Sequence, residues 1–351
     1  MATQESSTWC WGAPPSASSA MPLVRCWWSV TRKGILPNPP RQPGRNEPPK
    51  PMVSLPSPAA PLPVMKLSGS KGPETAFGCA RDFLDNRLVY LVVSPRARGL
   101  SIGVNFNPDK KCNFDCSYCE VNRGIPSTNP DFDIDKMQQE LERTMTFVLT
   151  GRLRERPHYR TLPDELLRMH HVAISGDGEP TLAPRFAQGV EALIHLRARG
   201  RFPFFKLVVI TNACGFDRPE VLRSLELLTP QDEIWAKLDA GTDEYLALVN
   251  RADRPLSAIL ANILLVAKER PVIIQSLFPS ISSAEPSAAE IEAYVGRLQQ
   301  LQRDGAQIPL VQIYSATRPT ARSRVGHLPL RQLSRIAQRV REATGLRAEV
   351  F

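Results

Sequence analysis

The sequence has no run of eighteen or more apolar residues. Its start also lacks the signature of a secretion signal, in which a basic segment precedes a continuous apolar stretch and a small-residue cleavage site. Cysteine is scarce: 7 cysteines among 351 residues are too few and too unevenly spaced for the disulfide framework of a small secreted protein. These absences predict a soluble cytoplasmic protein with no membrane partner.

The formal net charge of +9 at pH 7 is unevenly distributed. Residues 1–64 contain six basic and two acidic residues, a net charge of +4, so the remaining residues carry only +5. Strong net charge would point to nucleic acid or an anionic membrane surface. A charge of +5 spread over the larger part of the chain permits RNA binding without requiring it, so RNA stays a candidate partner.

Residues 1–64 differ in composition from the rest, with fourteen of the 33 prolines, four of the five tryptophans and no helical or strand period. We predict that this Pro-rich N-terminal extension is disordered. One interpretation is an upstream extension, with Met65 opening the folded protein; the other is a Pro-rich docking tail. We favour the first. Residues 65–99 are then a lead-in, and 100–351 form the core domain.

From residue 100 onward, apolar strand-like runs alternate with amphipathic stretches, which is typical of repeated βα units around a parallel sheet. We expect six strands, at residues 100–107, 171–175, 205–212, 233–239, 272–278 and 310–316. We expect six helices, at residues 134–151, 184–199, 219–228, 256–269, 288–302 and 329–344. The sequence therefore predicts an α/β fold, a partial (β/α)6 TIM-like barrel, with its site at the carboxyl ends of the strands.

Polar side chains alternate along these strands in a way that predicts a polar barrel interior. Successive residues of a strand face opposite sides, so one face of the fourth strand carries Glu233, Trp235, Lys237 and Asp239. The other strands offer matching polar positions, namely Ser101, Gly103, Asn105, Asn107, Gln275, Gln312 and Tyr314. A roomy lumen that holds a polar cofactor explains this set. The alternative is that some strands are misassigned and the polar face meets solvent.

Three cysteines, Cys112, Cys116 and Cys119, stand at the spacing C-x3-C-x2-C directly after the first strand. A spacing this regular is hard to obtain by chance in a sequence so poor in cysteine. A 4Fe-4S cluster normally takes four thiolates, so three leave one iron open to a small-molecule ligand. A zinc site would want a fourth Cys or His at a regular spacing, and the nearest candidates, Cys79 and His158, fit no such pattern.

The cysteine motif with its aromatic residue, Tyr118, resembles the radical S-adenosylmethionine (SAM) superfamily. The resemblance implies that this loop wraps a 4Fe-4S cluster and that the backbone beside Tyr118 meets the SAM adenine. A second motif, Gly176-Asp-Gly178-Glu179-Pro, follows the second strand and is similar to the superfamily's GGE motif, which binds the amino group of the SAM methionine. Asp177 stands where many members have glycine, while Glu179 is intact.

Further candidate cofactor-binding residues lie at the strand ends: Asn212, Lys237, Asp239 and Gln275. Lys237 and Asp239 could equally form a structural ion pair. His170 and His171 precede the second strand at its opposite end, and we assign them to the fold. From residue 87 to the end, the motifs resemble iron–sulfur oxidoreductases similar to tRNA wyosine synthases.

The resemblance implies reductive cleavage of SAM to methionine and a 5′-deoxyadenosyl radical, which abstracts hydrogen from a substrate. It also implies a one-electron donor such as flavodoxin or ferredoxin. The substrate is open, with an RNA base as one candidate, and no residue can be named as acid, base or radical quencher. Two alternatives remain at this point. One is an activating enzyme that makes a glycyl radical on a partner protein, and the other is a non-catalytic RNA-binding protein with a structural metal site.

Overall fold

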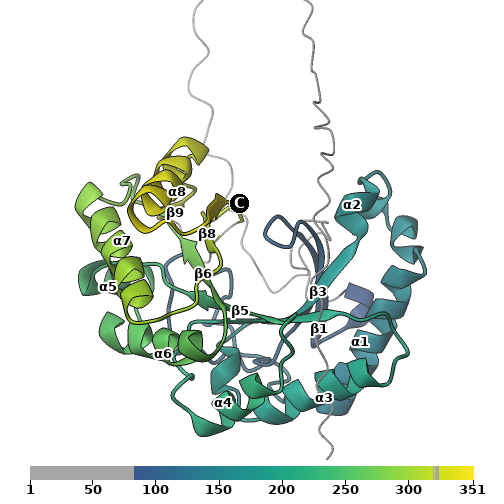
Figure 1. Cartoon of the computed structure of the whole chain (residues 1–351). Helices are drawn as coiled ribbons and strands as arrows, with labels where there is room; N and C mark the ends of the chain where they lie inside the picture. Colours follow the sequence, from purple (N-terminus) through teal and green to yellow (C-terminus); the bar gives the residue numbers. More distant parts are fainter. Residues whose placement is uncertain (1–82, 319, 321–323) are drawn as a thin grey trace, which may run out of the picture. The chain divides into compact units, whose positions relative to one another are not determined.

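The computed structural model describes residues 83–318, 320 and 324–351. A curled sheet of eight strands runs in the order β1-β2-β3-β4-β5-β6-β8-β10 (Figure 1). The strands are β1 (Val89–Ser94), β2 (Gly99–Val104), β3 (Met169–Ile174), β4 (Lys206–Thr211), β5 (Glu233–Lys237), β6 (Val272–Leu277), β8 (Val311–Tyr314) and β10 (Ala348–Val350). All neighbouring pairs are parallel except β1 with β2. The predicted α/β partial barrel is therefore confirmed.

Helices line the outer face of the sheet and follow its curve (Figure 1). They are α1 (Ile134–Leu149), α2 (Asp164–Leu167), α3 (Phe186–Ala198), α4 (Pro219–Glu226), α5 (Asp243–Val249), α6 (Leu256–Glu269), α7 (Ala288–Arg303) and α8 (Leu330–Thr344). Short 3-10 turns lie at 83–85, 152–155, 157–159 and 180–182, and β7 (Ser280–Ile281) pairs with β9 (Val325–Gly326). Side-chain caps open several helices: Asp133 accepts from Lys136 N, and Ser287 from Glu290 N.

Two strands of the sheet were not predicted from sequence, and both lie at its edges. β1 falls in the segment predicted as a lead-in and pairs with β2 through a tight hairpin. β10 pairs with β8. It has only three residues, and so short a strand cannot be predicted from periodicity. The six predicted strands are all present, but β2 ends at Val104 rather than at residue 107. The predictions for residues 1–64 and for 65–82 lie outside the described residues.

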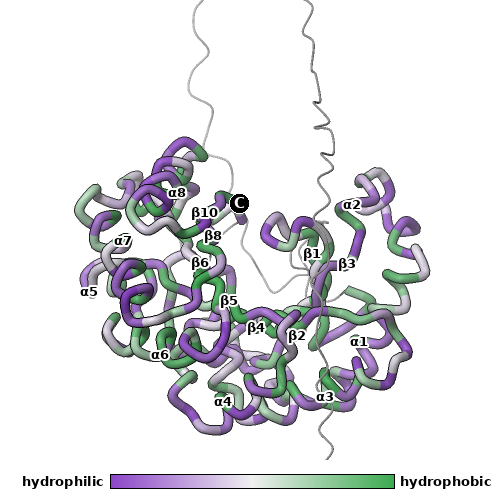
Figure 2. Tube along the Cα trace, viewed as in Figure 1, coloured by the Kyte–Doolittle hydropathy of each residue, from purple (hydrophilic) through white to green (hydrophobic). Residues whose placement is uncertain are grey.

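The sheet separates a large apolar core from a smaller layer inside the curl. The large core lies between the strands and the helices and contains residues such as Ile102, Ile174 and Ile234. The inner layer consists of Ala173, Val208, Trp235 and Ile273, each on the opposite face of its strand from the large core. Figure 2 shows β1 and β6 as largely hydrophobic, as expected for strands with both faces covered.

The hairpin turn at residues 95–98 reaches across the open side of the sheet toward its last strand (Figure 1). Arg98 forms an ion pair with Glu349 of β10 at 2.6 Å. The guanidinium of Arg96 lies over the ring of Tyr314 in β8, 4.1 Å from the ring centroid. These two contacts join the edges β1–β2 and β8–β10. Among the described residues, no helix combines the length and hydropathy needed to cross a membrane.

Candidate active site

The loop that carries the three cysteines follows β2 and is tied to the segment after α5. The backbone N–H of Ser117 donates to the carbonyl of Val249 at 2.7 Å, and that of Asp115 donates to the carbonyl of Asn250 at 3.1 Å. Farther back, Asn113 accepts from the N–H of Asp253 at 3.3 Å. Three backbone hydrogen bonds therefore fix the cysteine loop over the carboxyl ends of the strands.

Each cysteine sulfur of this loop accepts a hydrogen bond from a nearby N–H. Cys112 accepts from its neighbour Phe114 N at 3.4 Å, Cys119 from Arg123 Nη1 at 3.3 Å, and Cys116 from Asn250 Nδ2 at 3.5 Å. Such donors favour the thiolate form, whereas burial opposes it. Burial, followed by Glu179, raises the pKa of Cys112 to about 12, and burial, followed by Asp239, raises the pKa of Cys116. Metal binding must therefore release protons from these thiols.

The glutamate of the second motif is buried and holds three segments together. Oε1 of Glu179 accepts from Thr181 N at 3.1 Å, Thr181 Oγ1 at 2.6 Å and Thr211 Oγ1 at 2.5 Å. Oε2 accepts from Asn212 N at 2.7 Å, and Asn212 in turn donates to Asn113 in the cysteine loop at 2.8 Å. Oε2 thus accepts one hydrogen bond, and because a carboxylate oxygen has about two acceptor sites, one site on Oε2 is left.

Gly178 is required by close packing of the second motif against the cysteine loop. A Cβ at this position would lie 1.9 Å from the carbonyl oxygen of Lys111 and 2.6 Å from the Cβ of Asn107. The next residue, Glu179, donates its N–H to the same Lys111 carbonyl at 3.0 Å. The glycine of the motif therefore allows the loop after β3 to lie against the loop after β2.

We predict that Gly178→Ala lowers the free energy of unfolding by about 1–3 kcal/mol, because the added methyl group must displace backbone of the cysteine loop. Urea unfolding and iron content after anaerobic reconstitution should both fall. The matched control is Gly296→Ala on α7, where a Cβ meets nothing within 4 Å. That variant should be as stable as the wild type or more stable. Equal behaviour of the two variants would contradict the packing argument.

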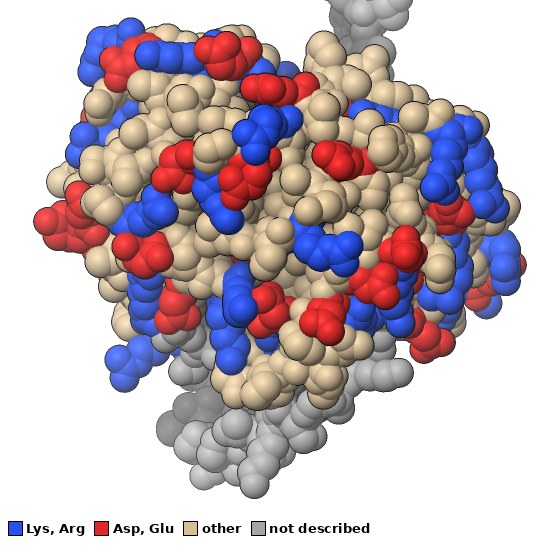
Figure 3. Space-filling model, turned by 90° about the horizontal axis from the view of Figure 1, so that it is seen from below, with Lys and Arg blue, Asp and Glu red and all other residues tan. Residues whose placement is uncertain are grey.

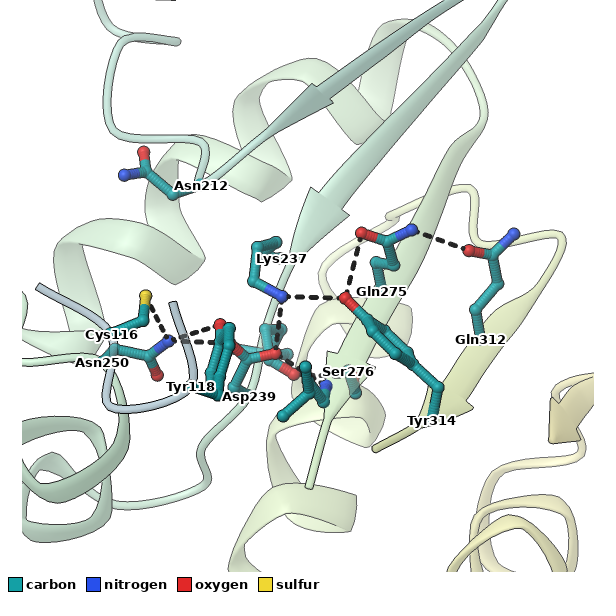
Figure 4. A network of polar contacts seen from close by, with 12 residues as sticks. Cys116, Tyr118, Asn212, Lys237, Asp239, Asn250, Gln275, Ser276, Gln312 and Tyr314 are labelled. Carbon is teal, nitrogen blue, oxygen red and sulfur yellow. Dashed lines mark hydrogen bonds and ion pairs between the residues drawn. The ribbon is translucent and has the colours of Figure 1, made fainter. Parts of the chain in front are cut away.

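Asp239 lies at the centre of a buried network below the cysteine loop (Figure 4). Its Oδ2 accepts from the Tyr118 hydroxyl and from Asn250 Nδ2 at 2.7 Å. Its Oδ1 accepts from Leu277 N at 2.8 Å and pairs with Lys237 Nζ at 3.2 Å. Burial, followed by Asp239, raises the pKa of Tyr118, so the phenol stays protonated and donates. The network links the end of β5, the end of β6 and the cysteine loop.

The network continues across the lumen from Lys237. Its Nζ donates to the Tyr314 hydroxyl at 3.1 Å, and that hydroxyl donates to Gln275 Oε1 at 3.3 Å. Gln275 Nε2 then donates to Gln312 Oε1 at 3.1 Å. Burial lowers the pKa of Lys237, but Asp239 and then Tyr314 outweigh it, and the net shift is upward. Lys237 is therefore a cation throughout the ordinary pH range.

These residues lie within a segment that matches a known family. The family model described as the radical SAM superfamily matches residues 106–279, from the cysteine loop to the segment after β6. The chain belongs to the radical SAM superfamily. The match contains both sequence motifs and all ten predicted cofactor- and metal-binding residues. Membership of this superfamily implies a 4Fe-4S cluster and SAM as the cofactors of residues 106–279.

Two curated proteins and a solved structure are similar to this chain. The UPF0026 protein of Helicobacter pylori strain 26695 is 28% identical over 181 residues, which are 50% of this chain and 49% of that protein. The corresponding protein of strain J99 is 29% identical over 181 residues. The chain thus spans about half the length of the curated relatives it matches. Among solved structures, a radical SAM methyltransferase from Sphaerobacter thermophilus has a TM-score of 0.53 at 18% identity, covering 75% of this chain and 68% of that one. This likeness shows the fold alone.

The three loop cysteines are the type of ligand that an iron–sulfur cluster requires. In the part of the chain that the structure describes, no three His, Cys, Asp or Glu side chains are grouped closely enough to bind one metal ion. The three loop cysteines are instead partly exposed free thiols, each with its own hydrogen-bond donor. A cuboidal cluster needs its thiolates spread around several irons, whereas zinc needs four ligands converging on one point.

The structure brings most of the predicted site residues into one region. Tyr118, Lys237, Asp239 and Gln275 belong to the network of Figure 4. Asn212 donates to Glu179 and to Asn113 of the cysteine loop. Lys237 and Asp239 form the ion pair that the sequence left open. Sequence reasoning missed Asn250 and Arg123, because an isolated Asn or Arg in a loop carries no pattern.

Proposed function

We propose that Cys112, Cys116 and Cys119 hold a 4Fe-4S cluster whose open iron binds SAM, and that the lumen beside Lys237 and Gln275 receives the substrate. When bound and reduced, such a cluster would supply the one electron needed for reductive cleavage of SAM and radical chemistry on a substrate. The observation that carries this proposal is that the three-thiol loop contacts the polar network of Asp239, Lys237 and Gln275 at the ends of β5 and β6 (Figure 4). The protein's part is to orient SAM and to exclude water from the radical.

The carboxylate of Glu179 is the proposed acceptor for the ammonium group of SAM. It lies close enough to Cys112 to raise the pKa of that thiol, which places it beside the cluster loop. Four donors from Thr181, Thr211 and Asn212 fix its orientation and leave one acceptor site on Oε2. The protein groups thus orient the carboxylate before SAM binds, which reduces the entropy lost on binding.

We predict that Glu179→Gln weakens SAM binding about tenfold or more while leaving the cluster in place, because a charge-assisted hydrogen bond contributes about 1.5–3 kcal/mol. Calorimetry of the reconstituted enzyme with SAM tests this, with iron content measured on the same sample. Thr211→Val is the matched control, since it removes one structural donor to Oε1 and leaves Oε2 unchanged. If both variants bind SAM like the wild type, Glu179 does not hold the ammonium group.

An RNA base remains one proposed substrate, and the surface charge of the protein bears on how the RNA could bind. Figure 3 shows the surface from below the view of Figure 1, where basic and acidic side chains are interspersed without a continuous basic patch. That face supports no long phosphate track. An RNA substrate would therefore present an extruded or single-stranded base to the lumen. The test is whether tRNA, a peptide pool or a small-molecule extract raises 5′-deoxyadenosine above the background of reduced enzyme with SAM.

A flavodoxin or ferredoxin is the proposed electron donor.

A further inference from the structure

Arg96 is a cation of the lumen that has no charged partner among the described residues. It extends from the hairpin turn at residues 95–98, and its guanidinium carbon lies 4.1 Å from the ring centroid of Tyr314. Its Nε is buried without a hydrogen-bond partner. A guanidinium stacked on an aromatic ring is held in one orientation and keeps its edge donors for a planar acceptor. Its neighbour Arg98, by contrast, is paired with Glu349.

Gln312 provides a second donor on the same side of the lumen. Its side chain is 2% exposed, and its Oε1 already accepts from Gln275. Its Nε2 donates to none of the residues drawn in Figure 4. Gln312 stands two residues before Tyr314 on β8, so the two side chains share a face about 7 Å apart.

The charges around the lumen leave Arg96 uncompensated. Lys237 is matched by Asp239 at 3.2 Å, and Lys206 by Glu233 at 2.6 Å. Burial, assisted by Lys206, His170 and Arg96, lowers the pKa of His171 to about 3, so this imidazole is neutral. Among the described residues, Arg96 is thus a cation that forms no ion pair, while the two lysines beside the strands do. A guanidinium without an ionic partner next to an amide N–H donor favours an anion.

We propose that Arg96 and Gln312 bind a carboxylate or phosphate group of the substrate, and that this contact turns the reacting carbon toward the cysteine loop. The inference rests on the proposed function, because it assigns the substrate class of the same lumen. The hydrogen-bonded path Tyr314–Lys237–Asp239 runs from Arg96 to the loop, so an anionic group at Arg96 would leave the rest of the substrate beside the proposed SAM site. The carboxylate of SAM offers the same chemistry and must be distinguished from the substrate.

The test uses the full chain with its reconstituted cluster and saturating SAM, titrated calorimetrically with orthophosphate and with succinate at constant ionic strength. We expect at least one probe to bind the wild type, with an affinity about tenfold or more weaker in Arg96→Gln. Arg98→Gln is the matched control, two residues away in the same turn, and should bind within about twofold of the wild type. Gln312→Leu should also weaken the probe, which keeps the test valid if Arg96→Gln folds poorly.

The outcomes separate three cases. If neither probe binds the wild type at up to about 50 mM, the proposed anion site is wrong. The same holds if Arg96→Gln and Gln312→Leu bind the probe as tightly as the wild type does. If Arg96→Gln instead weakens SAM itself, measured without probe, the guanidinium serves the cofactor and the substrate assignment fails. The proposed function is judged separately, by release of 5′-deoxyadenosine from SAM in the reduced wild-type enzyme without any probe.

Discussion

Replacement of Cys112, Cys116 and Cys119 together by alanine should abolish iron binding and SAM cleavage completely. The wild type, reconstituted under anaerobic conditions, should bind about four irons and absorb near 400 nm, because three thiolates can hold a cuboidal cluster. The variant loses every cluster ligand of the loop. Iron content, the visible spectrum and 5′-deoxyadenosine release measure the loss.

The control for this experiment is Cys214→Ala. Cys214 is a buried free thiol at the end of β4 and lies outside the cysteine loop. Its replacement should leave iron content at the wild-type level, with at most a small loss of stability from the lost packing. A triple variant that keeps a full cluster would overturn the assignment of the three loop cysteines. Loss of the cluster in Cys214→Ala alone would show that a fourth thiol takes part.

Asp239→Ala should lower the free energy of unfolding by about 3–5 kcal/mol, even before cofactors bind. The substitution leaves Lys237 as an uncompensated cation that is only 16% exposed, and it removes the acceptor of Tyr118, Asn250 and Leu277. Burial alone would lower the pKa of Lys237, so in the variant this group should give up its proton more readily. Urea unfolding of the metal-free chain under reducing conditions gives the measurement.

A double variant, Lys237→Met with Asp239→Ala, separates the charge from the hydrogen bonds. Removing both charges should recover part of the lost stability, because a buried cation no longer lacks its partner. The stability that is not recovered would come from the hydrogen bonds that Tyr118, Asn250 and Leu277 donate to Asp239. If Asp239→Ala unfolds at the same urea concentration as the wild type, the network of Figure 4 contributes nothing to stability, and the argument for a preorganised lumen fails.

The order of strands and the two cofactor motifs could be predicted from sequence because each rests on local pattern. The spacing of Cys112, Cys116 and Cys119, and the glycine and glutamate of the second motif, stand in consecutive residues. Strand alternation also predicted that Trp235 and Lys237 share one face of their strand, toward the inside of the barrel. The inner layer that contains Trp235 confirms this for Trp235.

The contacts that shape the site could not be predicted, because they join residues far apart in the chain. Asn250 meets Cys116 across 134 positions, and Tyr314 meets Lys237 across 77. The sequence also gave no sign that Glu179 would be surrounded by Thr181, Thr211 and Asn212. Such partners depend on how loops from different strands meet at one end of the barrel, which periodicity does not encode.

The ion pair between Arg98 and Glu349 joins positions 251 residues apart, and it bears on the order of events during synthesis. A ribosome makes the cysteine loop long before it makes β10. Until residue 349 has emerged, the side of the lumen beside β8 lacks its last strand and the hairpin turn has no carboxylate to hold. A cluster inserted before β10 has paired with β8 would therefore face oxygen and water through an open edge of the sheet, so insertion after this pairing suits the architecture.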